Sequence, residues 1–131
     1  MGMTVSTAGR NAMVDALVDL LDGGSGDATG DLVVTNSSDS IIATCTFSAT
    51  AFGSASAGTA TAASITGDTN MTGGTAARWQ ARNKSNAEIF RGNVGVSGSG
   101  AEMIVSTTTF PAGGSLTISS FTVTQPAGST T

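Results

Sequence analysis

Beyond residue 31 the chain alternates short runs rich in β-branched residues with stretches of Gly, Asn, Asp and Ser, and this punctuation limits what it can fold into. Such runs are typical of strands, and the residues between them are typical of turns. Strands that follow one another with no helix between them predict an all-β domain, either an antiparallel sandwich or a barrel. We expect seven strands, at Leu32–Thr35, Ile41–Phe47, Gly58–Ile65, Ala76–Arg82, Ala87–Val94, Glu102–Thr107 and Ser115–Thr124.

The apolar core of this domain is expected to be thin. Only 25 of the 131 residues are Ile, Leu, Val or Phe. That share is close to the boundary of roughly 20% below which highly charged chains are disordered. This chain carries a net charge of −4, with 11% charged residues, so we expect it to fold. So few apolar residues provide little stabilisation beyond the conformational entropy cost of folding. A partner that binds only the folded form would add stability.

An amphipathic helix is predicted near the N-terminus, capped by Ser6 or Thr7 and ended by the glycine pair at 23–24. Its apolar residues recur at helical spacing: Met13, Val14, Leu17, Val18, Leu20 and Leu21. We therefore divide the chain into an N-terminal arm and helix, residues 1–24, and a β-sandwich domain, residues 25–131. The apolar stripe fits either the chain's own sheet or a neighbouring subunit. In the second case Met13, Leu17 and Leu21 are the predicted interface residues.

The residue types that carry most catalysis and metal binding are scarce. The chain has no His, no Tyr and a single Cys, Cys45, so the usual zinc sites and imidazole-assisted nucleophiles lack their residues. Asp27 and Asp31 lie four positions apart but lack the other ligands of a calcium loop, and we interpret them as solvated loop acids. We expect no enzymatic activity, no catalytic residue, no cofactor and no metal.

The charge balance and the N-terminal sequence bear on possible partners. The sequence pI is about 4.3, whereas nucleic-acid binding needs a basic face that displaces phosphate counterions. Asp15 and Asp19 interrupt the apolar residues of the N-terminal segment, which matches neither a signal peptide nor a membrane span. We therefore expect no nucleic-acid partner and no membrane partner.

The segment RWQARNKSNAEIFRG, residues 78–92, holds the only Trp and four of the five basic residues. It predicts a hairpin over residues 76–93 with a turn at NKSN. Period-two alternation places Trp79 on one face of the first arm and Arg78 and Arg82 on the other. Trp79 is expected to anchor the core. The basic residues, Arg78, Arg82, Lys84 and Arg91, form either a solvated face or a surface that docks on an acidic partner.

The order of several segments resembles a group of small virion structural proteins of tailed bacteriophages, which are similar to capsid decoration (cement) proteins. These segments are NAMVDALVDLLDGG, TFSATAFG, GTATAASITGDT, GTAARW, GNVG and TISSFTVTQPA. The resemblance covers roughly residues 10–127. It implies a jelly-roll-like β-sandwich, assembled as dimers or trimers and bound to the major capsid protein on the outer shell. It also implies synthesis in the host cytoplasm and a final location on the capsid surface, where the chain reinforces contacts between capsomers.

Two other classes of function remain open at the level of sequence. A tail, neck or fibre-associated protein of the same virion would show the same composition and the same lack of catalytic residues. A carbohydrate-binding module on a β-sandwich scaffold is the third class. Sugar-binding platforms use exposed aromatic side chains, and Trp79 is the candidate for that role.

Overall fold

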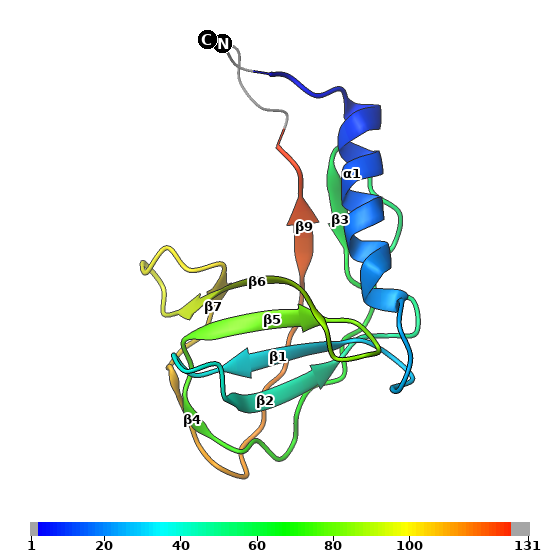
Figure 1. The fold of residues 1–131 in the computed structure, drawn as a ribbon. Coiled ribbons are helices and arrows are strands. Elements are labelled where there is room, and N and C mark those ends of the chain that lie inside the picture. Colours follow the sequence, from blue (N-terminus) through cyan, green and yellow to red (C-terminus); the bar gives the residue numbers. More distant parts are fainter. Residues whose placement is uncertain (1–2, 127–131) are drawn as a thin grey trace.

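A computed structural model describes residues 3–126 of the chain as a mostly β structure with one short N-terminal helix (Figure 1). Helix α1 spans Thr7–Asp19 and continues into a short 3-10 turn, η1, at Leu20–Asp22. The strands are β1 (Asp31–Thr35), β2 (Ile41–Thr46), β3 (Thr59–Thr61), β4 (Gly74–Thr75), β5 (Arg78–Arg82), β6 (Glu88–Gly95), β7 (Met103–Ile104), β8 (Thr109–Phe110) and β9 (Thr122–Thr124).

A curled five-stranded sheet with the order β2-β1-β5-β6-β7 forms the body of the molecule (Figure 1). Strands β2, β1, β5 and β6 pair antiparallel, as predicted, but β7 lies parallel to β6. The expected antiparallel arrangement is therefore wrong at this edge. The loop between β6 and β7 contains Gly98 and Gly100, both with positive φ, which allow the chain to circle back in few residues.

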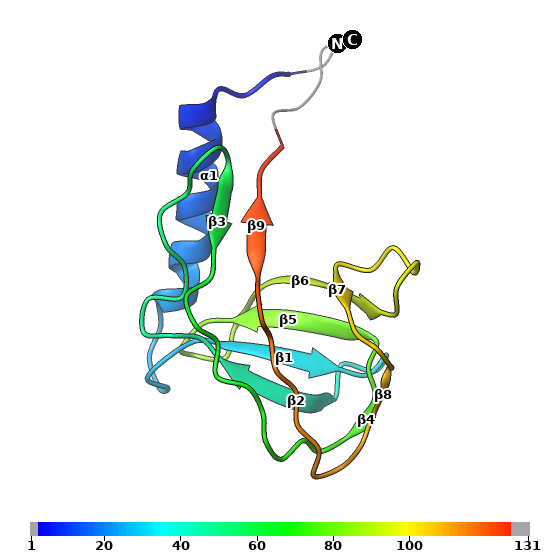
Figure 2. The same cartoon turned by 180° about the vertical axis from the view of Figure 1, so that it is seen from behind.

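Several predicted strands are shorter in the structure than the sequence indicated. Of Gly58–Ile65 only β3 is regular strand, and of Ser115–Thr124 only β9, and these two pair with each other away from the main sheet. Before β9, residues 115–121 cross the face of the main sheet as an extended segment (Figure 2). A single bridge, between Asp68 and Leu116, pairs this crossing segment with another part of the chain, so most of it is not assigned to a strand.

The predicted N-cap is confirmed, and the helix packs on its own chain. The Ser6 hydroxyl accepts a hydrogen bond from the Gly9 amide at 3.1 Å, which satisfies one of the free amides of the first turn. Val14, Val18 and Leu21 enter the same apolar core as the sheet, so the arm-and-helix region and the strand region share one core. Figure 1 shows α1 running alongside β3.

The polar side of α1 holds the loop that precedes β3. Two side chains of α1 and one of η1 accept hydrogen bonds from backbone amides of residues 51–58: Asn11 from Gly58 at 2.8 Å, Asp15 from Ala55 at 2.7 Å and Asp22 of η1 from Ala51 at 2.9 Å. Hydrogen bonds to a charged acceptor are stronger than neutral ones, so these acids stabilise a segment that has little apolar burial of its own.

Aromatic rings concentrate the thin core at one point. The ring of Phe121 lies within 5.2–6.3 Å, centroid to centroid, of those of Phe47, Phe52, Trp79 and Phe90, in tilted or edge-on geometries. Such pairs add stabilisation beyond the buried area. Phe121 belongs to the segment that crosses the sheet, so this cluster ties the end of the chain to the main sheet.

Candidate interaction surfaces

The β5–β6 hairpin confirms the predicted turn at residues 83–86 and the core position of Trp79. The Asn83 side chain closes the turn by accepting hydrogen bonds from the amides of Ser85 and Ala87. The Trp79 side chain is 7% exposed and lies against Gly92 of β6, where an added Cβ would come within 2.5 Å of the indole. A buried indole provides no flat platform for a sugar, which removes the feature that favoured a carbohydrate-binding module.

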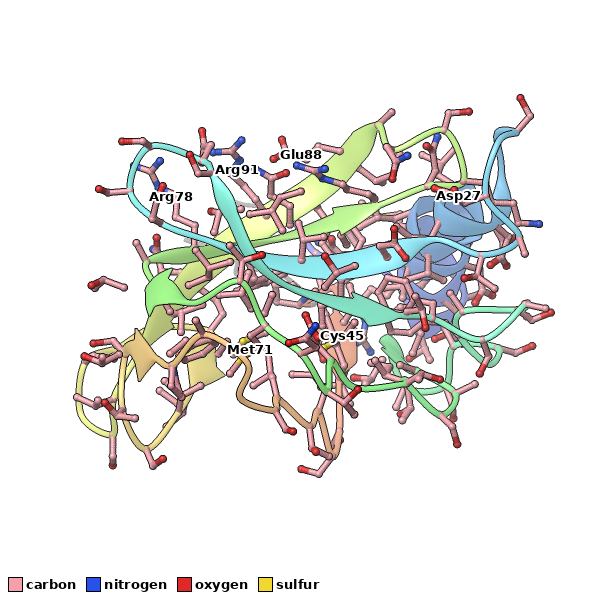
Figure 3. The ribbon with its side chains drawn as sticks, turned by 90° about the horizontal axis from the view of Figure 1, so that it is seen from below. Asp27, Cys45, Met71, Arg78, Glu88 and Arg91 are labelled. Carbon is pink, nitrogen blue, oxygen red and sulfur yellow. The ribbon has the colours of Figure 1, made fainter. Side chains whose placement is uncertain are left out.

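One face of the sheet carries three arginines, Arg78, Arg82 and Arg91. We call this surface, together with Asp39, Gln80 and Glu88, the arginine band. Figure 3 places Arg78, Glu88 and Arg91 together, on the side of the sheet away from Cys45 and Met71. Cross-strand pairing explains the grouping, because Gln80 of β5 lies opposite Arg91 of β6, and Arg82 lies opposite Glu88.

Acidic side chains within the same chain pair with two of these arginines. Asp39 Oδ1 lies 3.2 Å from Arg78 Nη1 and 3.5 Å from Arg91 Nη1, and Glu88 Oε1 lies 2.6 Å from Arg91 Nη2. The hydrogen bond with Glu88 raises the pKa of Arg91 above its ordinary value. Asp39 reaches its position from the β1–β2 turn with a φ of 63°, a conformation that Asp tolerates better than most residues. The band is therefore a mixed-charge surface.

The third arginine of the band bonds to a neutral partner. Arg82 donates from Nε and Nη2 to the Gln80 side-chain oxygen, at 2.9 and 2.7 Å, and this satisfies a Gln that is otherwise buried. Asp31 of β1 pairs with Arg82 across the strands. Burial, followed by the negative charge of Asp27, raises the pKa of Asp31, and the charge of Arg82 opposes this shift. Asp31 is thus partly buried in a strand and is not a freely solvated loop acid.

Lys84 lies apart from the band, in the hairpin turn. Its backbone amide donates to Gly23 O at 3.0 Å, and its carbonyl accepts from the Asp27 amide at 3.0 Å. These bonds clamp the turn against residues 23–27. Within residues 3–126 the Lys84 side chain forms no ion pair. Of the four basic residues predicted to act together, the structure brings three onto one face and leaves Lys84 at its end.

The helix presents a different stripe to the surface from the one predicted. Leu21 is 0% exposed within its own chain, because the 3-10 turn directs it into the core, so it forms no intermolecular interface. Leu20 takes its place and is 55% exposed, while Met13 is 47% exposed and Leu17 is partly buried. Positions 13, 17 and 20 follow helical spacing, and these three residues form what we call the helix stripe. The sequence pattern alone did not separate Leu20 from Leu21.

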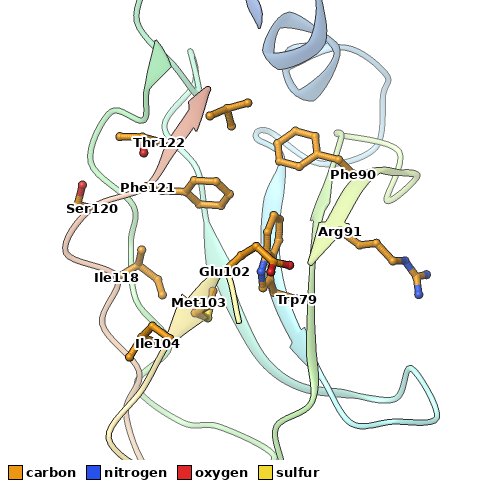
Figure 4. A pocket seen from close by; sticks show the side chains of 11 residues that line it. Trp79, Phe90, Arg91, Glu102, Met103, Ile104, Ile118, Ser120, Phe121 and Thr122 are labelled. Atoms are coloured by element: carbon orange, nitrogen blue, oxygen red, sulfur yellow. The ribbon is translucent and has the colours of Figure 1, made fainter. Parts of the chain in front are cut away.

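An apolar cleft of about 450 Å³, which sequence reasoning did not identify, lies between strands β6 and β7 and residues 118–123 (Figure 4). Its volume falls in the range of ligand sites, about 300–1,000 Å³. The lining is Trp79, Phe90, Met103, Ile104, Ile118, Phe121 and Val123, with Arg91, Glu102, Ser120 and Thr122 at the polar positions. Ile104 is 53% exposed.

A buried polar atom at the cleft lacks a partner. Within residues 3–126 the Trp79 Nε1–H donates to no acceptor, although indole N–H groups usually find one when buried. Nε1 belongs to the part of the indole that overlies Gly92, on β6. The donor therefore lies beside the strand that forms one wall of the cleft.

The described residues give little support for other kinds of site. Cys45 is buried, as predicted, and burial raises the pKa of its thiol, so the thiol stays protonated at neutral pH. Between residues 3 and 126 no group of three or more His, Cys, Asp or Glu side chains is arranged to hold a metal ion. No helix in that range is long and apolar enough to cross a bilayer.

Comparisons with protein-family models, with curated proteins and with solved structures found no match to this chain.

Proposed function

We propose that this chain is a virion structural protein of a tailed bacteriophage that binds the outer surface of the capsid as a decoration (cement) protein. The order of its segments, from the N-terminal helix to TISSFTVTQPA, supports this proposal. The mostly β fold with one short helix agrees with it in class. In this role the chain is made in the host cytoplasm, catalyses no reaction and reinforces contacts between capsomers.

The observation that carries the proposal is the helix stripe, an apolar surface that the chain does not use for its own core. Val14 and Val18 fix one side of α1 to the body, so Met13, Leu17 and Leu20 stand on a rigid element. A rigid apolar surface binds at a low cost in conformational entropy. We assign this stripe to the contact with the major capsid protein. Weak contacts of this kind add up when many copies bind one shell.

The proposal includes the finer architecture that the resemblance implies, a jelly-roll-like β-sandwich. Its second layer would be built from residues 115–126 together with β3, β4 and β8. The crossing segment lies over one face of the main sheet, which is the position of a second layer in a sandwich (Figure 2). Phe121 of this segment packs against Trp79 and Phe90 of the sheet.

Retention of variants on purified capsids tests the proposed contact. The double variant Met13→Glu, Leu20→Glu places two charges on the stripe, and both substituted residues are exposed. We expect the double variant to keep its thermal unfolding midpoint and to lose most of its occupancy on heads, measured by mass spectrometry of purified particles. Ile41→Glu, at an exposed position on β2, is the matched control and should retain full occupancy. Equal occupancy of both variants would remove the stripe from the interface.

The arginine band is a second predicted docking surface, and it is tested separately. Replacing Arg78 and Arg82 by Glu breaks contacts with Asp39 and Gln80 at the sheet surface and reverses two charges. We expect the isolated domain to remain folded and the variant to be retained less well on heads. Unchanged occupancy would leave the band with a purely structural role.

A tail, neck or fibre location in the same virion is the alternative function. Tail-less heads and isolated tails, purified from one lysate and compared by quantitative mass spectrometry, separate the two. The decoration role predicts the chain in heads at a copy number comparable with that of the capsid protein. Its restriction to tails would replace the decoration role with the alternative.

A further inference from the structure

We propose that the apolar cleft receives the N-terminal arm of a second copy of this chain, which adds as an extended strand beside β6. The part of the arm that we place in the cleft is Met3 to Ser6. This assignment does not rest on the proposed function, because it concerns the contact between copies and holds for any role of the assembly.

The first wall of the cleft is an open strand edge. β7 pairs only with Val94 and Gly95, so residues 88–93 of β6 have a strand partner on the β5 side alone. The Val94 amide donates to Ala77 O on the β5 side, and the Asn93 amide points outward to the Glu102 side chain at 2.9 Å. Because successive amides alternate in direction, the Arg91 amide also points outward. Such an edge is a template for an added strand.

The second wall offers apolar contact and a further open edge. β9 pairs with β3 on one side only, and the Phe121 carbonyl accepts from Ala62 on that same side. The side of residues 121–124 that faces the cleft therefore has no strand partner among the described residues. An occupant must supply backbone hydrogen-bonding groups as well as apolar side chains. This combination selects a polypeptide in extended form over a lipid or a sugar.

The N-terminal arm has the composition that the cleft requires. Met3 and Val5 alternate with Thr4 and Ser6, which is the period of a strand with one apolar face. Met3 is 73% exposed, the largest exposure among the large apolar side chains of the described residues. A Met side chain adapts to irregular gaps and makes favourable sulfur–aromatic contacts. The cleft offers Trp79, Phe90 and Phe121 for such contacts.

The cleft also matches the arm in charge. The arm carries no charged side chain before Arg10, and the two charged residues at the cleft are already engaged within the chain. Arg91 pairs with Glu88, and Glu102 accepts from the Asn93 amide.

The position of the arm indicates that the occupant comes from a neighbour. The arm leaves the N-terminal end of α1, whereas the sheet joins the other end, and both views show the arm at the end of the molecule far from β6 and β7 (Figures 1 and 2). A 13-residue helix separates these ends by about 20 Å at 1.5 Å per residue. Exchange of arms between copies fills each cleft, and the new strand pairing replaces the β-bridge that Thr4 forms within its own chain.

Sedimentation equilibrium of the wild-type chain and two glutamate variants tests the proposal. Met3→Glu replaces the apolar side chain proposed to enter the cleft, at a position that is exposed in the single chain. Met13→Glu places the same charge on the helix stripe and is the matched control. We expect the wild type and Met13→Glu to self-associate with the same Kd, and Met3→Glu to raise that Kd roughly tenfold to a hundredfold, the loss expected for one buried Met side chain. A wild type that stays monomeric, or a Met3→Glu variant with the wild-type Kd, overturns the proposal.

Cysteine pairing between two different variants locates the contact. Met3→Cys is mixed under oxidising conditions with Ile104→Cys, at the mouth of the cleft, or with Ile41→Cys, which is also exposed but lies on β2. The native Cys45 is buried, so we expect it to form no disulfide in this experiment. We expect a mixed disulfide with Ile104→Cys at several times the yield with Ile41→Cys. Equal yields would show that the arm does not reach the cleft.

Discussion

The arginine band and the apolar cleft meet at Arg91 of the β5–β6 hairpin, yet they differ in how far the chain satisfies its own polar groups. In the band, Asp39 and Glu88 pair with Arg78 and Arg91, and every guanidinium has a hydrogen-bond partner within the chain. In the cleft, Ile104 remains exposed and Trp79 Nε1 has no partner among the described residues.

This difference changes where association is expected. Exposed ion pairs contribute about 0–1 kcal/mol each, and a partner that binds the band must first compete with the pairs already formed. Apolar side chains exposed to water gain about 25 cal/mol for each Å² that a partner covers. The comparison therefore favours the cleft over the band as the site of the proposed self-association, and it leaves the band a weaker predicted contact.

Truncation of Phe121 should cause the largest loss of stability, because this ring joins the crossing segment to the sheet at the cleft. We expect Phe121→Ala to lower the free energy of unfolding by about 3 kcal/mol, at the low end of the range for aromatic truncations because the ring is partly buried. Urea denaturation followed by Trp79 fluorescence measures it. Ile104→Ala, at the exposed mouth of the same cleft, should change stability by less than about 0.5 kcal/mol. Similar losses for both would mean that the cleft is not arranged as described.

Gly92 is predicted to be essential for the packing of the Trp79 side chain beside the cleft. A Cβ at position 92 would lie within 2.5 Å of the indole, so Gly92→Ala should cost about 1–3 kcal/mol and shift the Trp79 emission. Gly53→Ala is the control, since the nearest atom to its Cβ would be 3.9 Å away and no unusual φ is required there. A Gly92→Ala protein as stable as the control would contradict the close packing of Trp79 on β6.

Removal of the acid shared by two arginines should have a small effect on folding. Asp39→Asn keeps the shape and tolerates the positive φ, but it removes the charge that faces Arg78 and Arg91. We expect a loss of less than about 1 kcal/mol, which vanishes in high salt because exposed charges are screened. Thermal unfolding at low and high salt measures this loss. A loss of several kcal/mol that persists in salt would show that the band is a structural core and would break the comparison.

The smallest effect is expected for the pH dependence at Asp31. Burial raises the pKa of this carboxyl above the unfolded value of 3.8, so the folded state binds the proton more tightly than the unfolded state. Stability from this group is therefore complete below pH 3.8 and declines as pH rises through the folded pKa. Asp31→Asn should match the stability of the wild type in acid and exceed it slightly at neutral pH. Wild-type stability that rises relative to the variant with pH would reverse this sign.

Local signals in the sequence predicted the elements whose stability is local. The Ser6 cap, the turn at residues 83–86 and the alternation around Trp79 each depend on residues close together in the chain, and each is confirmed. Strands β1, β2, β5 and β6 followed from β-branched runs of about the expected length, whereas β3 is shorter than predicted and β4 was not predicted.

Features that depend on distant residues were not predictable in the same way. The parallel pairing of β7 arises from the path of a glycine loop, and the pairing of Arg78 with Asp39 joins residues 39 positions apart. The change from Leu21 to Leu20 at the surface depends on a single 3-10 turn at the end of α1. The cleft forms only when residues 118–123 cross the sheet, so no short sequence window contains it.

Electron microscopy of intact phage particles, with the map resolved well enough to fit this fold, tests the central claim most directly. The account predicts density for the chain on the outer surface of the capsid, with the helix stripe against the shell and an extended strand from a neighbouring copy beside β6. A map that shows the chain absent from the head, or bound through the arginine band with the stripe and the cleft both facing solvent, would contradict it.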